Sequence, residues 1–493
     1  MDPKDVLITF PELLLWFPLI SGLIAFSLKH GNSAKNWALV SSFITLGIAV
    51  TSLFFMDNAK YFNLNNVSYF WMPSIGSSFA LKYDGMARLL CLLNAVAFPL
   101  VFLATYKQQY KNSNAFYCLM LLTQTGMMGV FCAMDALVFY FFWELALIPV
   151  YFLSSIWGGE KRIQATFKFF VYTFAGSLLL LIGIIYVYLH TAEQSFSLNA
   201  FMQANIPAKE GKLVFFLFFV AFAIKMPIFP FHTWQPDAYE HSPTGVTMIL
   251  SGVMVKMGIY AVIRWLIPVF PAATGIFANV IIWLSVIGMI YASLLAWRQD
   301  DLKRLVAYSS IAHIGLMCAA IFVRNESGLD GVMVQMFNHG VNVIALWIVI
   351  ELIERNFGTR KISELGGLAN AAPTLTVFLV ITAFANIALP LTNAFIGEFL
   401  MFNGLFAYGK AVTAFGLISI ILAAVYTLGM VQKVFYGEMS AVVSKTTPVL
   451  GRGAVAALAI IVVIIFVAGV YPKPMLDLTQ DSVDLFFNKL KGL

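Results

Sequence analysis

The chain has 493 residues, of which 60% are apolar and only 11% carry a charge. A soluble domain needs a polar surface, so this composition excludes a soluble protein and indicates that nearly all of the chain lies in lipid. The formal net charge of +6 is spread over short connections and forms no basic stripe, which argues against nucleic acid as a partner.

The apolar segments follow one another along the whole chain. A hydrocarbon layer about 30 Å thick is crossed by about 20 apolar residues in a helix, and about fourteen such segments are present. The predicted fold class is therefore an all-α integral membrane protein with about 14 transmembrane helices. The segments are centred near residues 18, 46, 95, 123, 146, 176, 221, 255, 286, 313, 341, 387, 422 and 461.

The short connections predict the orientation of the chain. If the first helix runs from outside to inside, the inner connections carry roughly fifteen Lys and Arg residues and the outer ones roughly eleven. The positive-inside rule then places both termini outside. The first residues contain no basic stretch followed by a small-residue cleavage site, so we expect the helices themselves to direct insertion.

Two segments are interrupted by proline, in AFAIKMPIFPFHTWQPDAYEHSP (221–243) and FANIALPLTNAFIGEF (384–399). Proline opens the helical hydrogen-bond ladder, and in a bilayer the freed carbonyls must face protein or water. The two segments are the seventh and twelfth, which predicts two inverted five-helix repeats, helices 4–8 and 9–13, with broken helices 7 and 12. The predicted units are residues 1–112, 113–270, 271–440 and 441–493. Ordinary transmembrane kinks are the alternative.

Four ionisable residues lie in the middle of apolar segments or beside a break: Glu144, Lys225, Lys256 and Glu398. Unpaired, the four would together cost on the order of 10 kcal/mol, comparable with the stability of a whole domain. We therefore interpret them as functional, with static ion pairs between helices as the alternative. Arg88 and Lys168 lie near helix ends, where a long stem reaches the headgroups, and are expected to be interfacial.

Two histidines lie on polar helix faces. His313 follows Ser309 by one turn, and His339 belongs to a face formed by Gln335, Asn338 and Asn342 at helical spacing. Such a face can hold a file of waters, and imidazole can pass protons near neutral pH. The alternative is a buried structural histidine.

These residues suggest a proton path with a switch. Burial favours the neutral form of a lysine, and a carboxylate within about 4–6 Å favours its charged form. If Glu144 approaches Lys225 the lysine keeps its proton, and if the pair opens the proton moves on toward Lys256 and the histidines. This is a hypothesis based on the central position of both signs of charge.

Five stretches together resemble a known family. They are FFWELALIPVYFL, AIKMPIFPFHTWQPDAYEHSPTGVTMILSGVMVKMGIY, DLKRLVAYSSIAHIG, FNHGVNVIALW and IGEFL, which occur in this order between residues 141 and 400. The chain resembles the M-type antiporter-like membrane subunits of bacterial NADH:quinone oxidoreductase, respiratory complex I.

This resemblance implies the roles of six residues. Glu144 and Lys225 match the pumping pair, Lys256, His313 and His339 match the central hydrophilic axis, and Glu398 matches its terminal group.

The resemblance also implies a proton-translocating subunit of the bacterial inner membrane, with periplasmic termini and no cofactor or redox centre in this chain. The implied partners are the L- and N-type antiporter-like subunits, small membrane subunits of complex I, the lipid bilayer, protons and internal water.

One feature bears on the choice among relatives. Glu398 stands where the L and N subunits and the Mrp antiporters generally place a lysine, which favours the M type. At the second break, Leu391 and Ala394 replace small or flexible positions of the family pattern. The alternatives are a Mrp-type Na⁺/H⁺ antiporter subunit, a stand-alone secondary transporter, and a subunit that binds haem or quinone.

Overall fold

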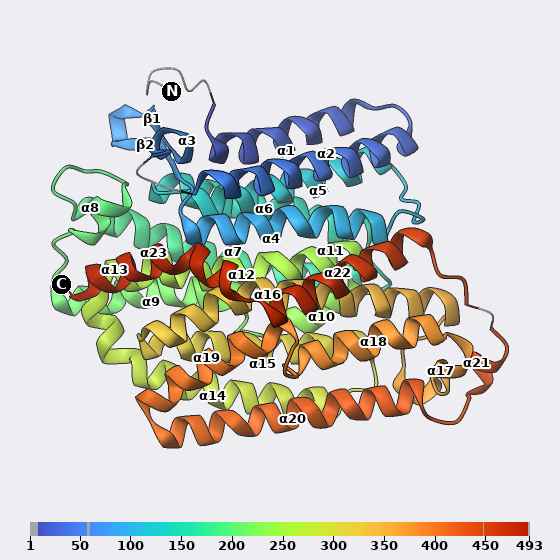
Figure 1. Ribbon diagram of the computed structural model, residues 1–493. Coiled ribbons are helices and arrows are strands. Elements are labelled where there is room, and N and C mark those ends of the chain that lie inside the picture. The colour runs from blue at the N-terminus through green and yellow to red at the C-terminus, as the bar shows by residue number, and fades with distance from the viewer. Residues whose placement is uncertain (1–7, 57–59, 447, 492–493) are drawn as a thin grey trace.

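The computed structural model describes residues 8–56, 60–446 and 448–491, which form a bundle of long helices lying side by side (Figure 1). Twelve helices in this part of the chain are long and apolar enough to cross a membrane. They are α1 (Phe10–Ser27), α2 with a short extension (Gly31–Phe55), α4 (Gly85–Ala104), α5 (Ser113–Cys132), α6 (Ala136–Trp157), α7 (Arg162–Leu189), the α11–α13 helix (Thr244–Val269), α14 (Pro271–Trp297), α15 (Leu302–Val323), α16 (Glu326–Phe357), α20 (Lys410–Phe435) and α22 (Arg452–Val470).

The other two predicted segments, near residues 221 and 387, do not form single helices of this kind. The first consists of α9 (Ala208–Lys225) and α10 (Trp234–His241), and the second of α18 (Pro373–Asn386) and α19 (Asn393–Tyr408). Pro227, Pro230 and Pro390 lie in the two interruptions, where proline cannot donate to the helical ladder.

The prediction that the chain is all-α misses a β-hairpin. Strand β1 (Asn66–Met72) pairs antiparallel with β2 (Ser77–Lys82) inside the connection between α2 and α4. In β2 the residues Ser77, Phe79 and Leu81 are buried and the alternate ones are half-buried, which is the two-residue period of a strand that covers the end of a bundle. Shorter helices are α3 (Phe62–Asn65), α8 (Leu198–Met202), α17 (Leu368–Ala371) and α21 (Ala441–Ser444).

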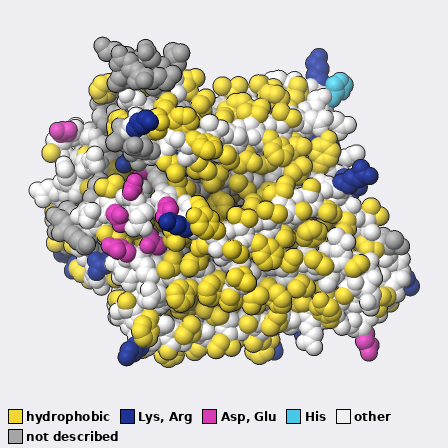
Figure 2. All heavy atoms as spheres, in the orientation of Figure 1, with side chains coloured by type: hydrophobic (Ala, Val, Ile, Leu, Met, Phe, Trp, Pro, Cys, Tyr) yellow, Lys and Arg dark blue, Asp and Glu magenta, His cyan; other side chains and the backbone are white. Residues whose placement is uncertain are grey.

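The bundle has two distinct ends (Figure 1). The hairpin end carries β1, β2, α8 and the last turns of α23 (Lys473–Lys491), the amphipathic C-terminal helix that packs on α4 and α16. The opposite end, here called the basic end, carries the connections 105–112, 158–161, 298–301 and 358–361. Hydrophobic side chains cover the middle of one face, with charged ones mostly toward the ends (Figure 2).

Two arginines have buried acceptors. Arg88, expected at the interface, is 2% exposed and donates to Ser52 O, Asn65 Oδ1 and Tyr83 O at 3.1–3.3 Å. Arg264, which the sequence analysis did not single out, lies within the α11–α13 helix and forms a 2.6 Å ion pair with Asp84. Each guanidinium finds buried acceptors of its own, so neither needs to reach the headgroups.

The second break contains two residues in the left-handed conformation. Ala388 has φ 55° and Leu391 has φ 72°, in a region that disfavours L-residues by roughly 1–2 kcal/mol. Ala394, in contrast, is an ordinary buried residue of α19. A Cβ on Gly469 of α22 would lie 2.3 Å from the Leu391 carbonyl oxygen and 2.6 Å from the Thr392 carbonyl carbon. The backbone of the break therefore packs directly against α22.

We predict that Gly469→Ala destabilises the purified chain by about 1–3 kcal/mol, because its methyl group must push the backbone of the break away from α22. Gly429→Ala in α20 is the matched control. A Cβ there meets nothing within 4 Å, so the better helix former should be neutral or stabilising by up to about 1 kcal/mol. Thermal unfolding in detergent measures both variants. Equal stability of the two would contradict the close contact.

Candidate functional site

Lys256 is the fully buried centre of the candidate site. The α11–α13 helix contains a π-helical turn at Leu250–Met254, just before Lys256. This turn offers the Ser251 carbonyl to the Lys256 side chain, whose Nζ donates to it at 2.6 Å. The same Nζ lies 2.9 Å from Nδ1 of His339 on α16. A π-bulge thus turns a backbone carbonyl into a partner for a buried ammonium.

The contacts continue from His339 to the second break. The rings of His339 and His313 have centroids 5.5 Å apart, and Nδ1 of His313 lies 3.1 Å from Oε1 of Glu398 on α19. Lys256, His339, His313 and Glu398 are each at most 8% exposed. Four of the six predicted residues therefore lie in one line that crosses from the α11–α13 helix through α16 and α15 to α19.

Several neutral groups border this line, and the sequence analysis named only Ser309 and Gln335 among them. Ser310 Oγ lies 3.3 Å from Nε2 of His339, and the Tyr426 hydroxyl donates to Ser309 Oγ at 2.8 Å. Gln335 Nε2 lies 3.4 Å from Oε1 of Glu398. A cavity of about 10 Å³, close to the size of one water, adjoins His313, Glu398 and Tyr426.

The polar face of α16 also supports the second break. Asn338 Nδ2 donates to the Asn393 carbonyl at 2.6 Å, and Asn342 Nδ2 donates to the Ala385 carbonyl at 3.2 Å. These carbonyls belong to the two helix ends that face each other across the interruption. These two amides thus bind backbone carbonyls on both sides of the break. The expected file of waters along this face stays a prediction.

Glu144 and Lys225 stand apart from this line and from each other. Neither Lys225 Nζ nor the buried Oε1 of Glu144 has a hydrogen-bond partner among the described residues, and no ion pair within 4.0 Å joins the two side chains. Lys225 Nζ lies 5.3 Å from the ring centroid of Trp143. The two side chains therefore form no ion pair in this structure.

The first break has its own support. Lys225 is the last residue of α9, where carbonyls lose their helical partners. Trp234, the first residue of α10, donates from Nε1 to the Ile224 carbonyl at 3.0 Å. One buried indole thus ties the two helices together directly beside Lys225.

Helix interruptions beside buried titratable side chains, with two imidazoles between a lysine and a carboxylate, are the features of an antiporter-like proton-translocating membrane subunit. Residues 133–425 match the family model described as NADH:quinone oxidoreductase/Mrp antiporter, TM. NADH-quinone oxidoreductase subunit M of Rickettsia typhi is 34% identical over 96% of this chain and 97% of its own. The chain belongs to this family of M subunits.

Solved structures show the same fold. A chain of respiratory complex I from Thermus thermophilus superposes with a TM-score of 0.88 at 25% identity, covering 97% of this chain and 99% of the other. A chain of the Mrp complex from Dietzia gives a TM-score of 0.84 over 96% of both chains, at 19% identity. The second likeness concerns the fold alone.

We predict that Trp234→Phe destabilises the chain by about 1–3 kcal/mol, because it leaves the buried Ile224 carbonyl without its donor. Trp297→Phe is the control, since Trp297 is 54% exposed. The midpoint of thermal unfolding in detergent measures both. A Trp234→Phe chain as stable as the control would show that the indole does not hold the break.

Proposed function

We propose that this chain translocates protons as a membrane subunit of NADH:quinone oxidoreductase, driven by redox chemistry in other subunits. The observation that carries the proposal is the contact line Lys256–His339–His313–Glu398. Every group in it can bind and release a proton, and its partners are placed for transfer and not for binding a solute. Glu144 and Lys225 are the proposed switch at its start.

The geometry suggests the steps. The Lys256 ammonium gives a proton to Nδ1 of His339, 2.9 Å away. The imidazolium then releases its other proton from Nε2, which lies on the side of Ser310. His313 takes it up at Nε2, for which no protein group is a partner among the described residues, and passes a proton from Nδ1 to Glu398. Between the two rings a single water would complete the transfer, because Nε2 of His313 has no hydrogen-bond partner among the described residues.

The switch acts before these steps. With the Glu144–Lys225 pair open, burial of Lys225 disfavours its charge, and its proton is driven toward Lys256. When the carboxylate approaches, the ammonium is stabilised and the proton stays. The open pair observed here corresponds to the releasing state of this cycle.

We propose further that residues 113–270 and 271–440 are two five-helix repeats. In this scheme α9 with α10 and α18 with α19 are the broken helices at matching positions, which brings the crossings to fourteen. The four groups of the line come from both repeats. The basic end then faces the cytoplasm and both termini the periplasm, as the excess of Lys and Arg in its connections favours. Residues 1–112 and 441–493 flank the repeats.

The proposed partners are L- and N-type antiporter-like subunits and small membrane subunits, with no cofactor in this chain. A Mrp-type cation/proton antiporter subunit is the second candidate, because the fold superposes on the Dietzia Mrp chain. A haem or quinone subunit is less consistent with the imidazole nitrogens, which contact Lys256, Ser310 and Glu398.

We expect Lys225→Ala and, separately, Glu144→Ala to lower NADH-driven proton pumping in inverted membrane vesicles by about tenfold or more, because each removes an acid–base group from the path. Quinone reductase activity and assembly of the complex are followed in parallel. Lys410→Ala and Glu193→Ala are controls of the same residue types at exposed positions.

Normal pumping by an assembled complex that carries Lys225→Ala or Glu144→Ala would show that the pair has a structural role and no role in proton transfer. Proton-coupled sodium flux in the same vesicles, lost in Lys225→Ala and independent of NADH, would instead favour the Mrp-type candidate.

A further inference from the structure

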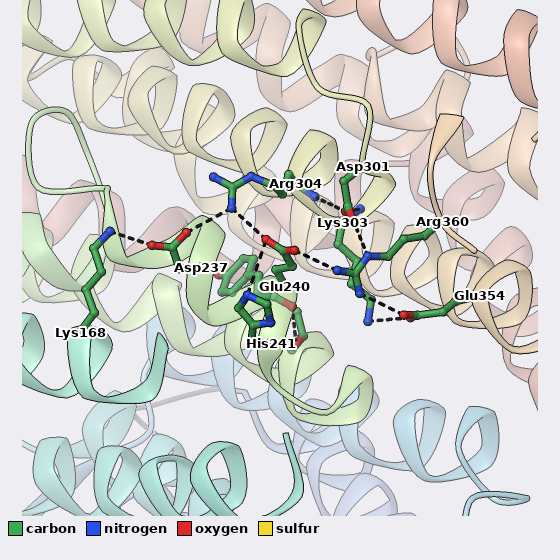
Figure 3. A network of polar contacts seen from close by, with 11 residues as sticks. Lys168, Asp237, Glu240, His241, Asp301, Lys303, Arg304, Glu354 and Arg360 are labelled. Carbon is green, nitrogen blue, oxygen red and sulfur yellow. Dashed lines mark hydrogen bonds and ion pairs between the residues drawn. The ribbon is translucent and has the colours of Figure 1, made fainter. Parts of the chain in front are cut away.

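The basic end carries a chain of ion pairs outside the proposed proton path (Figure 3). Cations and carboxylates alternate along it, so that every internal group has a partner of opposite charge on each side. Its members come from four helices and one connection: Lys168 of α7, Asp237 and Glu240 of α10, Lys303 and Arg304 of α15, Glu354 of α16, and Arg360 of the connection after α16, with Asp301 as a branch at the start of α15.

Helix α10 is held at both of its carboxylates. Asp237 lies 2.7 Å from Lys168 Nζ and 3.1 Å from Arg304 Nη1. Glu240 lies 2.8 Å from the same nitrogen of Arg304 and 2.9 Å from Arg360 Nη2. Arg304 thus joins two successive turns of α10 to the start of α15.

The chain of ion pairs continues to the end of α16. Arg360 lies 3.0 Å from Glu354, whose other oxygen lies 2.7 Å from Lys303 Nζ. Arg360 also binds Asp301, and the backbone pairs around Asp301 and Lys361 fix this connection to the start of α15. Burial lowers the pKa of the Arg360 guanidinium, but Asp301, Glu354 and Glu240 raise it above its ordinary value.

These helices carry the groups of the proposed path. Helix α10 has only eight residues and follows the interruption that begins after Lys225. Arg304 lies on α15 nine positions before His313, and Glu354 lies on α16, which carries His339. A shift of α10 along the bundle would therefore move the Lys225 break relative to both histidines unless these ion pairs hold it.

The network is buried on the side of Glu240, Arg360 and Lys303, whose side chains are 17%, 21% and 6% exposed. Arg304 and Asp237 are more open, at 30% and 32%. Exposed ion pairs contribute little, whereas removing one partner of a largely buried pair is unfavourable. The loss of Arg304 would remove the group that contacts both carboxylates of α10 and would leave Asp237 with Lys168 and Glu240 with Arg360.

We propose that this ion-pair network is the device that positions α10 against α15 and α16, with Arg304 and Glu240 as positioning residues for proton transfer from the Lys225 side to the Lys256 side. Only the role of Arg304 and Glu240 in proton transfer rests on the proposed function. The fixing of α10 is a structural statement and is tested separately.

The test uses the whole complex with Arg304→Ala, Glu240→Gln and Arg304→Lys. Hydrogen exchange of the backbone amides in residues 226–241, followed by mass spectrometry, reports how firmly α10 and the interruption before it are held. Protons pumped per NADH report the coupling. The matched control is Lys361→Ala, which removes an exposed pair with Glu364 in the same connection, at 60% and 43% side-chain exposure.

We expect Arg304→Ala and Glu240→Gln to speed exchange of residues 226–241 and to lower protons pumped per NADH by about threefold, within the range typical of coupling networks. Arg304→Lys should keep most of the exchange protection and most of the protons pumped per NADH, because it keeps the positive charge next to the two carboxylates. Lys361→Ala should change neither.

Unchanged exchange in Arg304→Ala overturns the positioning role, whatever the pumping does. Faster exchange with normal pumping shows that α10 is held but that its position does not matter for transfer, which also overturns the proposal. If Lys225→Ala and Glu144→Ala pump normally, the pair is structural and the proposed switch fails, and the exchange data still decide whether the network holds α10.

Discussion

The hydrocarbon core provides no water to pair with polar groups, and the structure of this chain depends on how it meets that constraint. A backbone break in lipid leaves carbonyls without partners, each unfavourable by several kcal/mol. The chain places protein donors at each break: the Trp234 indole at the first and the amides of Asn338 and Asn342 at the second. These polar side chains add hydrogen bonds to the backbone on either side of the interruptions.

The same constraint distinguishes the two halves of the candidate path, the Glu144–Lys225 pair and the line from Lys256 to Glu398. In the second half, every titratable group contacts another: Lys256 with His339, and His313 with Glu398. In the first half, Glu144 and Lys225 remain apart and Lys225 faces an aromatic ring. Buried charge without a partner is unfavourable, so the first half is the place where a change of proton occupancy alters the energy most. A switch is expected there and a conducting relay in the second half.

The candidate site residues could be predicted because an ionisable group in the centre of an apolar segment is rare enough to notice. Which of these residues contact one another could not be predicted, because the contact between α16 and α19 depends on packing that no local sequence pattern reveals. The sequence analysis also missed Arg264, because its helix continues beyond the apolar core. It missed the β-hairpin because strands of seven and six residues resemble an ordinary connection. Both misses lie at the ends of the bundle, where hydropathy carries little information.

The second break shows how local conflict and global packing are balanced. Leu391 and Ala388 adopt a left-handed backbone that glycine would accept at no steric cost. Their conformations persist because the surroundings determine them: α22 approaches through Gly469, and α16 donates two amides to the flanking helix ends. Glu398 lies in the second turn of α19, just beyond this fixed segment, and contacts His313. The strain is thus stored where a rigid backbone keeps the carboxylate in contact with its imidazole, and a more flexible break would loosen the contact between Glu398 and His313.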